Sequence, residues 1–199
     1  MPQRANGRLR VAAILEAAAD VIAEKGYEAA TMAEIAARSG TKIGSLYRFF
    51  PNKESLADTL VVGSRENLDT VFDKFDTVVG ALSVQALADA LVAQLAEQIF
   101  GKPALMKLMD ASENWSVKRE EFKSAALRHI AKSLLIHSPS LPTKSAEDIA
   151  LVVLLNTKTM AKQQDLRGSA LEEFRDMTRL YLQSRLKAEK TPHPNRKSN

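Results

Sequence analysis

Apolar residues recur along this chain at the three- and four-residue spacing that is typical of amphipathic helices. The first such stretch runs from Arg8 to Lys25 and is followed by Gly26, a residue that commonly ends a helix. Its apolar face comprises Val11, Ile14, Leu15, Ala18 and Ile22. No stretch alternates apolar and polar residues for long enough to indicate a strand. The pattern therefore predicts an all-α protein.

Two short helices are expected next. Thr31 and Glu34 form a T-x-x-E capping box at the start of the first helix, which ends at Ser39-Gly40. The second covers about residues 42–50 and ends before Pro51, because proline disfavours helical geometry in the preceding residue. Two short helices with a glycine in the turn between them are the signature of a helix-turn-helix.

The remainder of the chain continues the helical pattern. Asn52 caps a long fourth helix, which carries Leu56, Leu60, Leu68, Val71, Phe72 and Phe75. Further helices are expected at about 83–100, 104–111, 116–137, 145–164 and 169–188, with breaks at glycine- and proline-containing segments. We therefore divide the chain into a helix-turn-helix domain at 1–53, a larger helical domain at 54–188 and a tail at 189–199.

Charge is distributed unevenly along the 199 residues, which carry a net charge of +4. Residues 1–53 hold eight Lys/Arg and five Asp/Glu, a net charge of +3, and residues 185–199 hold five Lys/Arg and one acid, a net charge of +4. The middle is mildly acidic. A basic N-terminal domain suits a polyanion, whereas the Pro-, Lys- and Ser-containing tail is read as a disordered, solubilising end.

Composition excludes several classes of site. The chain has no cysteine, so disulfides, thiolate metal sites and cysteine nucleophiles are impossible. No apolar run is long enough to span a bilayer, and the N-terminal residues lack the apolar core of a signal peptide. These features predict a cytoplasmic protein.

The expected helix at 42–50 has two contrasting faces. Leu46, Phe49 and Phe50 cluster on one side, and Gly44, Tyr47 and Arg48 point the opposite way. Glycine allows close approach to another surface, tyrosine can donate to a phosphate, and arginine can read guanine bidentately. This outward face predicts a helix that enters a major groove.

Two helix N-termini flank this candidate recognition helix. Lys53 follows the cap of the fourth helix, and Thr31 stands at the start of the second. Free amides and the positive end of the helix dipole favour an anion at such positions. We therefore expect both helix starts to clamp the phosphate backbone.

Residues 11–60 resemble the DNA-binding domain of the TetR family of transcriptional regulators. The matching stretches are ILEAAADVIAEKGYEAATMAEIAARSG and TKIGSLYRFFPNKESL. The resemblance covers about a quarter of the chain and does not assign the remainder to a subfamily. It implies phosphate contacts from Thr31, Tyr47 and Lys53. It also implies base or groove contacts from Lys42, Ile43, Gly44, Ser45 and Arg48.

The chain departs from the family pattern at two positions. Members often have an apolar residue where Thr41 stands and a serine where Lys42 stands. Thr41 is therefore a candidate cap for the recognition helix, with Lys42 as an added positive contact. Ile43 occupies a position that is often polar, and it could meet a thymine methyl or belong to the domain's own core.

Apolar residues of the larger domain suggest a ligand pocket. Methionine and aromatic side chains line adaptable pockets, although they also fill ordinary cores. Asn156 is the polar member of an apolar stripe formed by Ile149, Val152, Val153 and Met160, and could bond across a dimer interface or toward a ligand. The candidate pocket residues are Phe100, Met106, Met109, Trp115, Phe122 and Asn156.

The sequence therefore predicts a ligand-responsive transcriptional regulator, most simply a repressor. As the resemblance implies, it would bind a palindromic DNA operator as a homodimer through the helices near 145–164 and 169–188, and be released by a small molecule. No cofactor, metal site or catalytic group is expected, since the three histidines match no metal motif and no phosphate loop is present. The alternative is a helical small-molecule-binding protein or an enzyme without DNA-binding activity.

Overall fold

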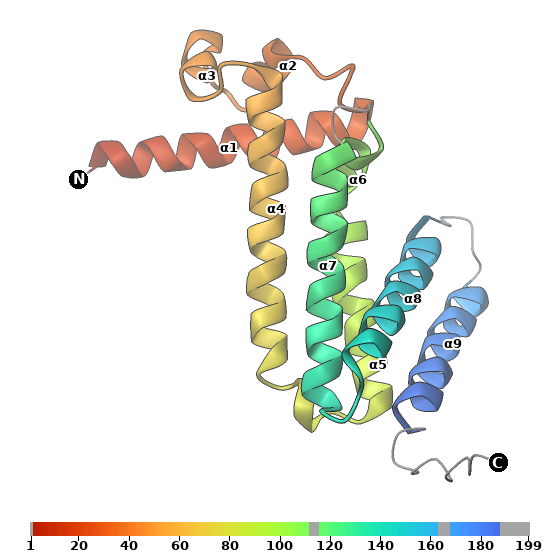
Figure 1. Cartoon of the computed structure of the whole chain (residues 1–199). Coiled ribbons are helices and arrows are strands. Elements are labelled where there is room, and N and C mark those ends of the chain that lie inside the picture. Colours follow the sequence, from red (N-terminus) through yellow and green to blue (C-terminus); the bar gives the residue numbers. More distant parts are fainter. Residues whose placement is uncertain (1, 112–115, 163–167, 188–199) are drawn as a thin grey trace, which may run out of the picture. The chain divides into compact units, whose positions relative to one another are not determined.

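The computed structural model describes residues 2–111, 116–162 and 168–187. These residues form helices joined by turns and contain no strand, which confirms the predicted all-α class (Figure 1). The α-helices are α1 (Pro2–Lys25), α2 (Met32–Arg38), α3 (Ile43–Phe49), α4 (Lys53–Asp76), α5 (Val84–Leu95), α6 (Pro103–Asp110), α7 (Ser116–His137), α8 (Thr143–Lys162) and α9 (Gly168–Lys187). Within the described residues, no helix is long and apolar enough to cross a membrane.

The helices divide between two compact units. Unit 1 comprises residues 1–68 and 98–123, and unit 2 comprises residues 69–97 and 124–199. The helices α4 and α7 each begin in unit 1 and end in unit 2. The sequence predicts a boundary at residue 53 from the helix-turn-helix motif. Unit 1 extends beyond this boundary and also includes α6, because α6 packs against α1.

The core of unit 1 lies among the first four helices and α6. Ile14 and Ile22 of α1, Ile35 of α2, Leu46 of α3 and Leu56 of α4 are all completely buried. Burial of such side chains stabilises the unit by about 1.5–3 kcal/mol each. The helices α1, α2 and α3 of the predicted DNA-binding domain are therefore fixed on one shared apolar core.

Unit 2 is built on the packing of α5 against α8 and α9. Its fully buried side chains include Leu87, Leu91, Ile149, Val153 and Leu182. Polar contacts join the later part of α4 to α7. His129 Nε2 lies 2.7 Å from Asp69 Oδ1, and the Ser133 hydroxyl donates to Asp76 Oδ1 at 2.6 Å.

Two elements differ from the expected pattern. The helix α1 begins at Pro2 rather than near Arg8. The helix expected at 83–100 ends at Leu95 and continues as a π-helical turn over Ala96–Phe100. Within this turn the side chain of Gln98 is buried and accepts a hydrogen bond from the Asn67 amide. A buried side-chain amide needs a hydrogen-bond partner, and the bond from Asn67 explains why Gln98 can be buried here.

Candidate nucleic-acid interface

The turn between α2 and α3 depends on glycine. Gly40 has a φ of +61°, in the left-handed region that disfavours residues with a Cβ. The backbone N–H of Thr41 then donates to the carbonyl of Ala36 at 2.9 Å. This turn connects the two helices through residues 39–42, so the predicted helix-turn-helix is present.

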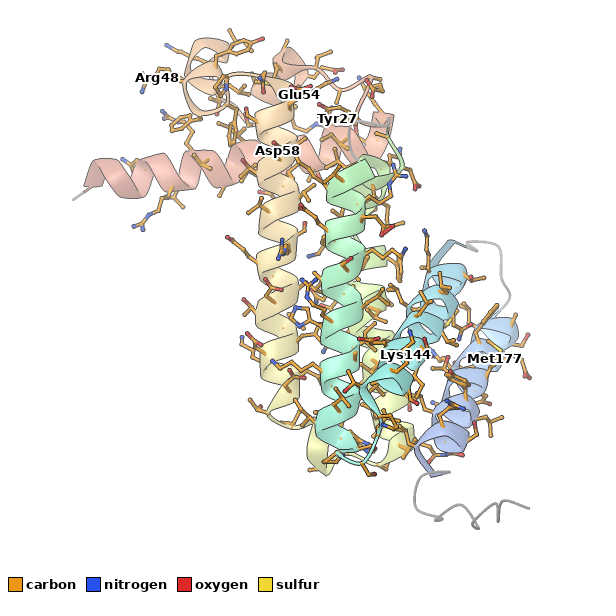
Figure 2. The ribbon with its side chains drawn as sticks, viewed as in Figure 1. Tyr27, Arg48, Glu54, Asp58, Lys144 and Met177 are labelled. Carbon is orange, nitrogen blue, oxygen red and sulfur yellow. The ribbon has the colours of Figure 1, made fainter. Side chains whose placement is uncertain are left out.

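The two faces of α3 are as the sequence predicts. Leu46 is completely buried and Phe50, directly after the helix, is 6% exposed. Tyr47 and Arg48 are exposed, and Figure 2 shows Arg48 projecting from the outer side of α3. A Cβ placed on Gly44 would meet nothing within 4 Å, so this position presents open backbone. The outer face of α3 can approach another surface closely and bring Tyr47 and Arg48 to it.

The start of α3 resolves two open assignments. Thr41 is buried, and the N-cap residue is Lys42, which makes no side-chain capping bond. The candidate capping role of Thr41 is therefore wrong: its side chain joins the core instead. Ile43 is 44% exposed, which makes it available on the outer surface rather than part of the core. Ser45 is half-buried at the flank of this surface.

Ion pairs fix α2 on α1. The guanidinium of Arg38 donates to both carboxylate oxygens of Glu24, at 2.5 and 2.8 Å, and Lys25 pairs with Glu34. These partners hold the pKa of Glu24 and the pKa of Glu34 below their ordinary values, mainly through hydrogen bonds from Arg38 and Lys25 respectively. Arg38 and Lys25 are thus engaged within the unit.

The predicted capping box is also present. Thr31 Oγ1 accepts from the Glu34 N–H at 3.2 Å and donates to the Glu34 carboxylate at 3.0 Å. Thr31 remains exposed.

Among the described residues, Lys42 and Arg48 have no ion-pair partner, so their charges are available at the outer face of α3.

Lys53 has a different environment from the one the sequence suggests. Its ammonium donates to the carbonyls of Tyr27 and Glu28, at 2.8 and 3.0 Å, and lies 4.5 Å from the centre of the Tyr27 ring. Burial, with smaller contributions from Glu54, Glu28 and Asp58, raises the pKa of Tyr27. Lys53 therefore positions the start of α4 against the chain that follows α1, and its contact with a phosphate stays a prediction.

Four of the candidate ligand residues belong to unit 1. Met109 and Phe122 are buried in unit 1, Phe100 and Met106 are half-buried there, and Trp115 lies outside the described residues. Their ligand role stays a prediction.

Asn156 belongs to unit 2, where its amide donates to Thr178 Oγ1 at 2.5 Å. It also donates to the carbonyl of Phe174 at 3.4 Å. Asn156 thus joins α8 to α9 within one chain, and its contact with a ligand or across a dimer interface stays a prediction.

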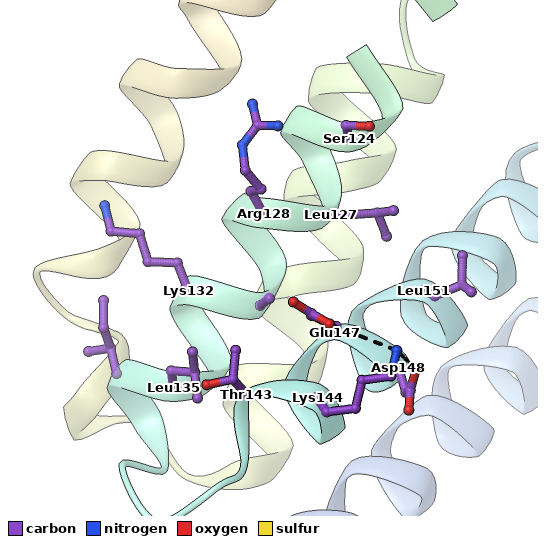
Figure 3. A pocket seen from close by; sticks show the side chains of 12 residues that line it. Ser124, Leu127, Arg128, Lys132, Leu135, Thr143, Lys144, Glu147, Asp148 and Leu151 are labelled. Carbon is purple, nitrogen blue, oxygen red and sulfur yellow. Dashed lines mark ion pairs between the residues drawn. The ribbon is translucent and has the colours of Figure 1, made fainter. Parts of the chain in front are cut away.

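Unit 2 carries a groove of about 720 Å³ between α7 and α8 (Figure 3). Apolar side chains of α7 form much of its surface, including Leu127, Ala131 and Leu135. Arg128 and Lys132 line the same side, and Lys144 of α8 pairs with Asp148 at 3.2 Å. Sequence reasoning missed this groove, because its residues come together only when α7 and α8 pack.

A second surface feature of unit 2 is a set of exposed apolar residues on α8 and α9. We name it the α8–α9 face; it comprises Leu151, Val152, Leu155, Met177 and Leu180, which are 38–65% exposed. Leu151 also lines the groove of Figure 3. Large apolar side chains clustered on two adjacent helices mark a surface that other protein can cover.

Comparison with known proteins agrees with the geometry of unit 1. Residues 14–60 match the sequence model of a family described as bacterial regulatory proteins, tetR family. The matched segment runs from α1 into α4 and contains the whole helix-turn-helix.

Relatives with similar sequences are transcriptional repressors. The chain is 33% identical over 110 residues to the HTH-type transcriptional repressor KstR2 of Rhodococcus jostii. The aligned residues make up 55% of this chain and 52% of that repressor. It is 39% identical over 66 residues to KstR2 of Mycobacterium tuberculosis, which covers 33% of this chain and 32% of the relative. The chain thus matches about half or less of the length of these relatives.

Solved structures of regulators share the fold over most of the chain. A TetR-family regulator from Mesorhizobium loti superposes with a TM-score of 0.69 at 18% identity, covering 89% of this chain and 96% of the other. FadR from Bacillus subtilis, solved with stearoyl-CoA, gives 0.63 at 19% identity, with 85% and 96% covered. At these identities the likeness concerns the fold alone.

Proposed function

We propose that the chain is a member of the tetR family of bacterial regulatory proteins, and that it is a ligand-responsive transcriptional repressor that binds a palindromic operator as a homodimer. The outer face of α3 is the observation that carries this proposal. It combines open backbone at Gly44 with exposed Tyr47 and Arg48, on a helix whose opposite side is buried. A helix of this kind can enter a major groove with its side chains on base edges and phosphates.

Roles on this face follow from the chemistry of each side chain. Arg48 reads a guanine edge through two hydrogen bonds, and Ile43 contacts a thymine methyl. Tyr47 and Lys42 contact phosphates, which fix the register of α3 without reading sequence. Thr31 and Ser45 add hydroxyl donors beside the groove.

Two helix-turn-helix domains are needed for specific binding, because one short recognition helix reads only a few base pairs. Discrimination against a genome requires a longer site, which a symmetric dimer supplies as two half-sites. The α8–α9 face supports this arrangement, because its exposed Val152, Leu155 and Leu180 would be buried by a second copy. Half-sites close to one helical turn apart, or a multiple of it, are the geometric consequence.

Regulation would act through α4, which begins three residues after Phe50 and runs from unit 1 into unit 2. A shift of this helix carries α3 with it and changes the distance between the two recognition helices of a dimer on DNA. An effector acts only through its differential affinity for the two states, so operator DNA must weaken effector binding by the same factor by which effector weakens DNA binding. Such a regulator works in the cytoplasm, where its operator lies.

Selection of bound sequences from random duplex DNA tests this proposal. The purified full chain should enrich a palindrome whose two halves have the spacing given above. Enrichment of a single asymmetric half-site would contradict the dimeric arrangement, and the absence of any enriched sequence would contradict the repressor function.

A further inference from the structure

The first turns of α1 carry little of the core of unit 1. The helix begins at Pro2, and within residues 6–14 of it the one buried side chain is that of Ile14. Between them Arg8 and Arg10 are exposed, and the side chain of Leu9 is 71% exposed. This part of the helix therefore extends beyond the region where α1 packs on other helices.

The charge of this extension is one-sided. Residues 2–15 contain Arg4, Arg8 and Arg10 and no Asp or Glu before Glu16. Among the described residues, Arg8 and Arg10 have neither an ion-pair nor a hydrogen-bond partner. In contrast, Glu24 and Lys25 at the other end of α1 form ion pairs with Arg38 and Glu34 of α2. Short helical segments that pack on nothing are marginal in water, so packing within unit 1 gives no reason for this cationic extension.

The extension lies on the side of unit 1 that presents the recognition helix. In Figure 1 the first turns of α1 project past α4 on the side on which α3 lies, and Figure 2 shows Arg48 on that same side. Both elements belong to unit 1, so the arrangement is internal to one compact body. A polyanion approached by α3 would meet a second cationic element on α1.

We infer that Arg8 and Arg10 bind phosphates of the DNA backbone beside the groove that α3 enters. This inference rests on the proposed function, since it needs α3 on DNA, and it adds a contact that neither the helix-turn-helix match at 14–60 nor the predicted site includes. Residues two apart on a helix do not face each other, so the two guanidiniums bind separate phosphates. The contact is electrostatic and adds affinity without sequence preference.

The test compares the salt dependence of DNA binding for the wild type and Arg8→Ala/Arg10→Ala, using the selected operator and fluorescence anisotropy between 50 and 200 mM salt. Each phosphate contact contributes about 0.9 to the slope of log affinity against log salt. The slope of the double variant should be smaller than that of the wild type by about 1.8 for each subunit bound. The rise from 50 to 200 mM salt should therefore weaken binding by the wild type about 12-fold more than binding by the variant, for each subunit. Alanine is the better helix former, so the variant keeps its helix.

Two further variants sharpen the result. Arg65→Ala removes another exposed arginine of unit 1 that lacks a described partner, and it should leave the slope unchanged. Arg8→Lys/Arg10→Lys should keep the wild-type slope, because a phosphate needs a cation rather than the guanidinium fork. A slope for the double alanine variant equal to that of the wild type overturns the inference while the proposed function stands. If the wild type selects no duplex at all, the proposed function fails and this inference fails with it.

Discussion

Replacing Lys53 by methionine should loosen the helix-turn-helix without touching the outer face of α3. Methionine keeps the aliphatic stem and removes the ammonium. The change deletes the bonds to the carbonyls of Tyr27 and Glu28 and the contact with the Tyr27 ring. The part-buried bond to Tyr27 is worth about 1.5 kcal/mol, and the exposed bond to Glu28 is worth about 0.5 kcal/mol. The ring contact adds about 0.5–1 kcal/mol, for a total of about 2.5–3 kcal/mol.

Hydrogen exchange measured by mass spectrometry localises this effect. A loss of about 2.5–3 kcal/mol in the free energy of local opening should accelerate exchange of protected amides in residues 27–60 by about 70- to 160-fold. Lys74→Met is the matched control, because Lys74 is an exposed lysine of the same helix without a described partner. Unchanged exchange in Lys53→Met, together with a salt slope of DNA binding lowered by about one unit, would refute the positioning role and make Lys53 a direct phosphate contact.

Three further predictions concern separate parts of the chain. Arg48→Ala should relax preference at one base pair, at a cost of about 1–3 kcal/mol, measured by competition with single-substituted operators; an equal loss on specific and random DNA would make Arg48 a phosphate contact only. The lowered pKa of Glu24 stabilises the fold above its ordinary value of 4.5, and this contribution is lost as pH falls through the lowered value. Glu24→Gln removes the ionised partner of Arg38. The melting temperature of this variant should therefore fall less than that of the wild type when the pH is lowered from neutral to about pH 3, and equal falls would argue against the ion pair. Val152→Asp with Leu155→Asp should give a monomer in sedimentation equilibrium, and a fully dimeric variant would move the interface elsewhere.

The choice of that interface variant shows what periodicity alone leaves open. The sequence places Val152 and Val153 on one apolar stripe, but Val153 is completely buried and Val152 is 44% exposed. An aspartate at Val153 would disrupt the core of unit 2 rather than test a dimer. Which of two neighbouring apolar residues faces a partner depends on how α8 packs against α5 and α9, and this is set by tertiary structure.

Helix positions could largely be predicted, because apolar spacing, capping residues and breakers act locally. The capping box at Thr31, the cap at Asn52 and the inward side of Leu46 follow from neighbouring residues. The start of α1 could not be predicted, since its exposed first turns have no buried face to create a periodic signal.

Contacts between distant residues were also beyond the sequence. Lys53 reaches carbonyls 25 and 26 residues away, and Asn156 reaches Thr178, which is 22 residues away. Each of these polar side chains has an acceptor that only folding brings near. The sequence could not predict these intrachain bonds for this reason, whereas the exposure of Tyr47 and Arg48 depends on the packing of one helix and followed from periodicity.

The central claim is that the outer face of α3 reads DNA. The most direct measurement is the affinity of the wild type and of Tyr47→Ala/Arg48→Ala for the selected operator and for a random duplex of the same length. The two side chains are exposed, so their loss leaves the core of unit 1 intact. The account predicts that the preference for the operator falls by at least about 5-fold, the lower bound for loss of one bidentate base contact. An operator affinity equal to that of the wild type would contradict it.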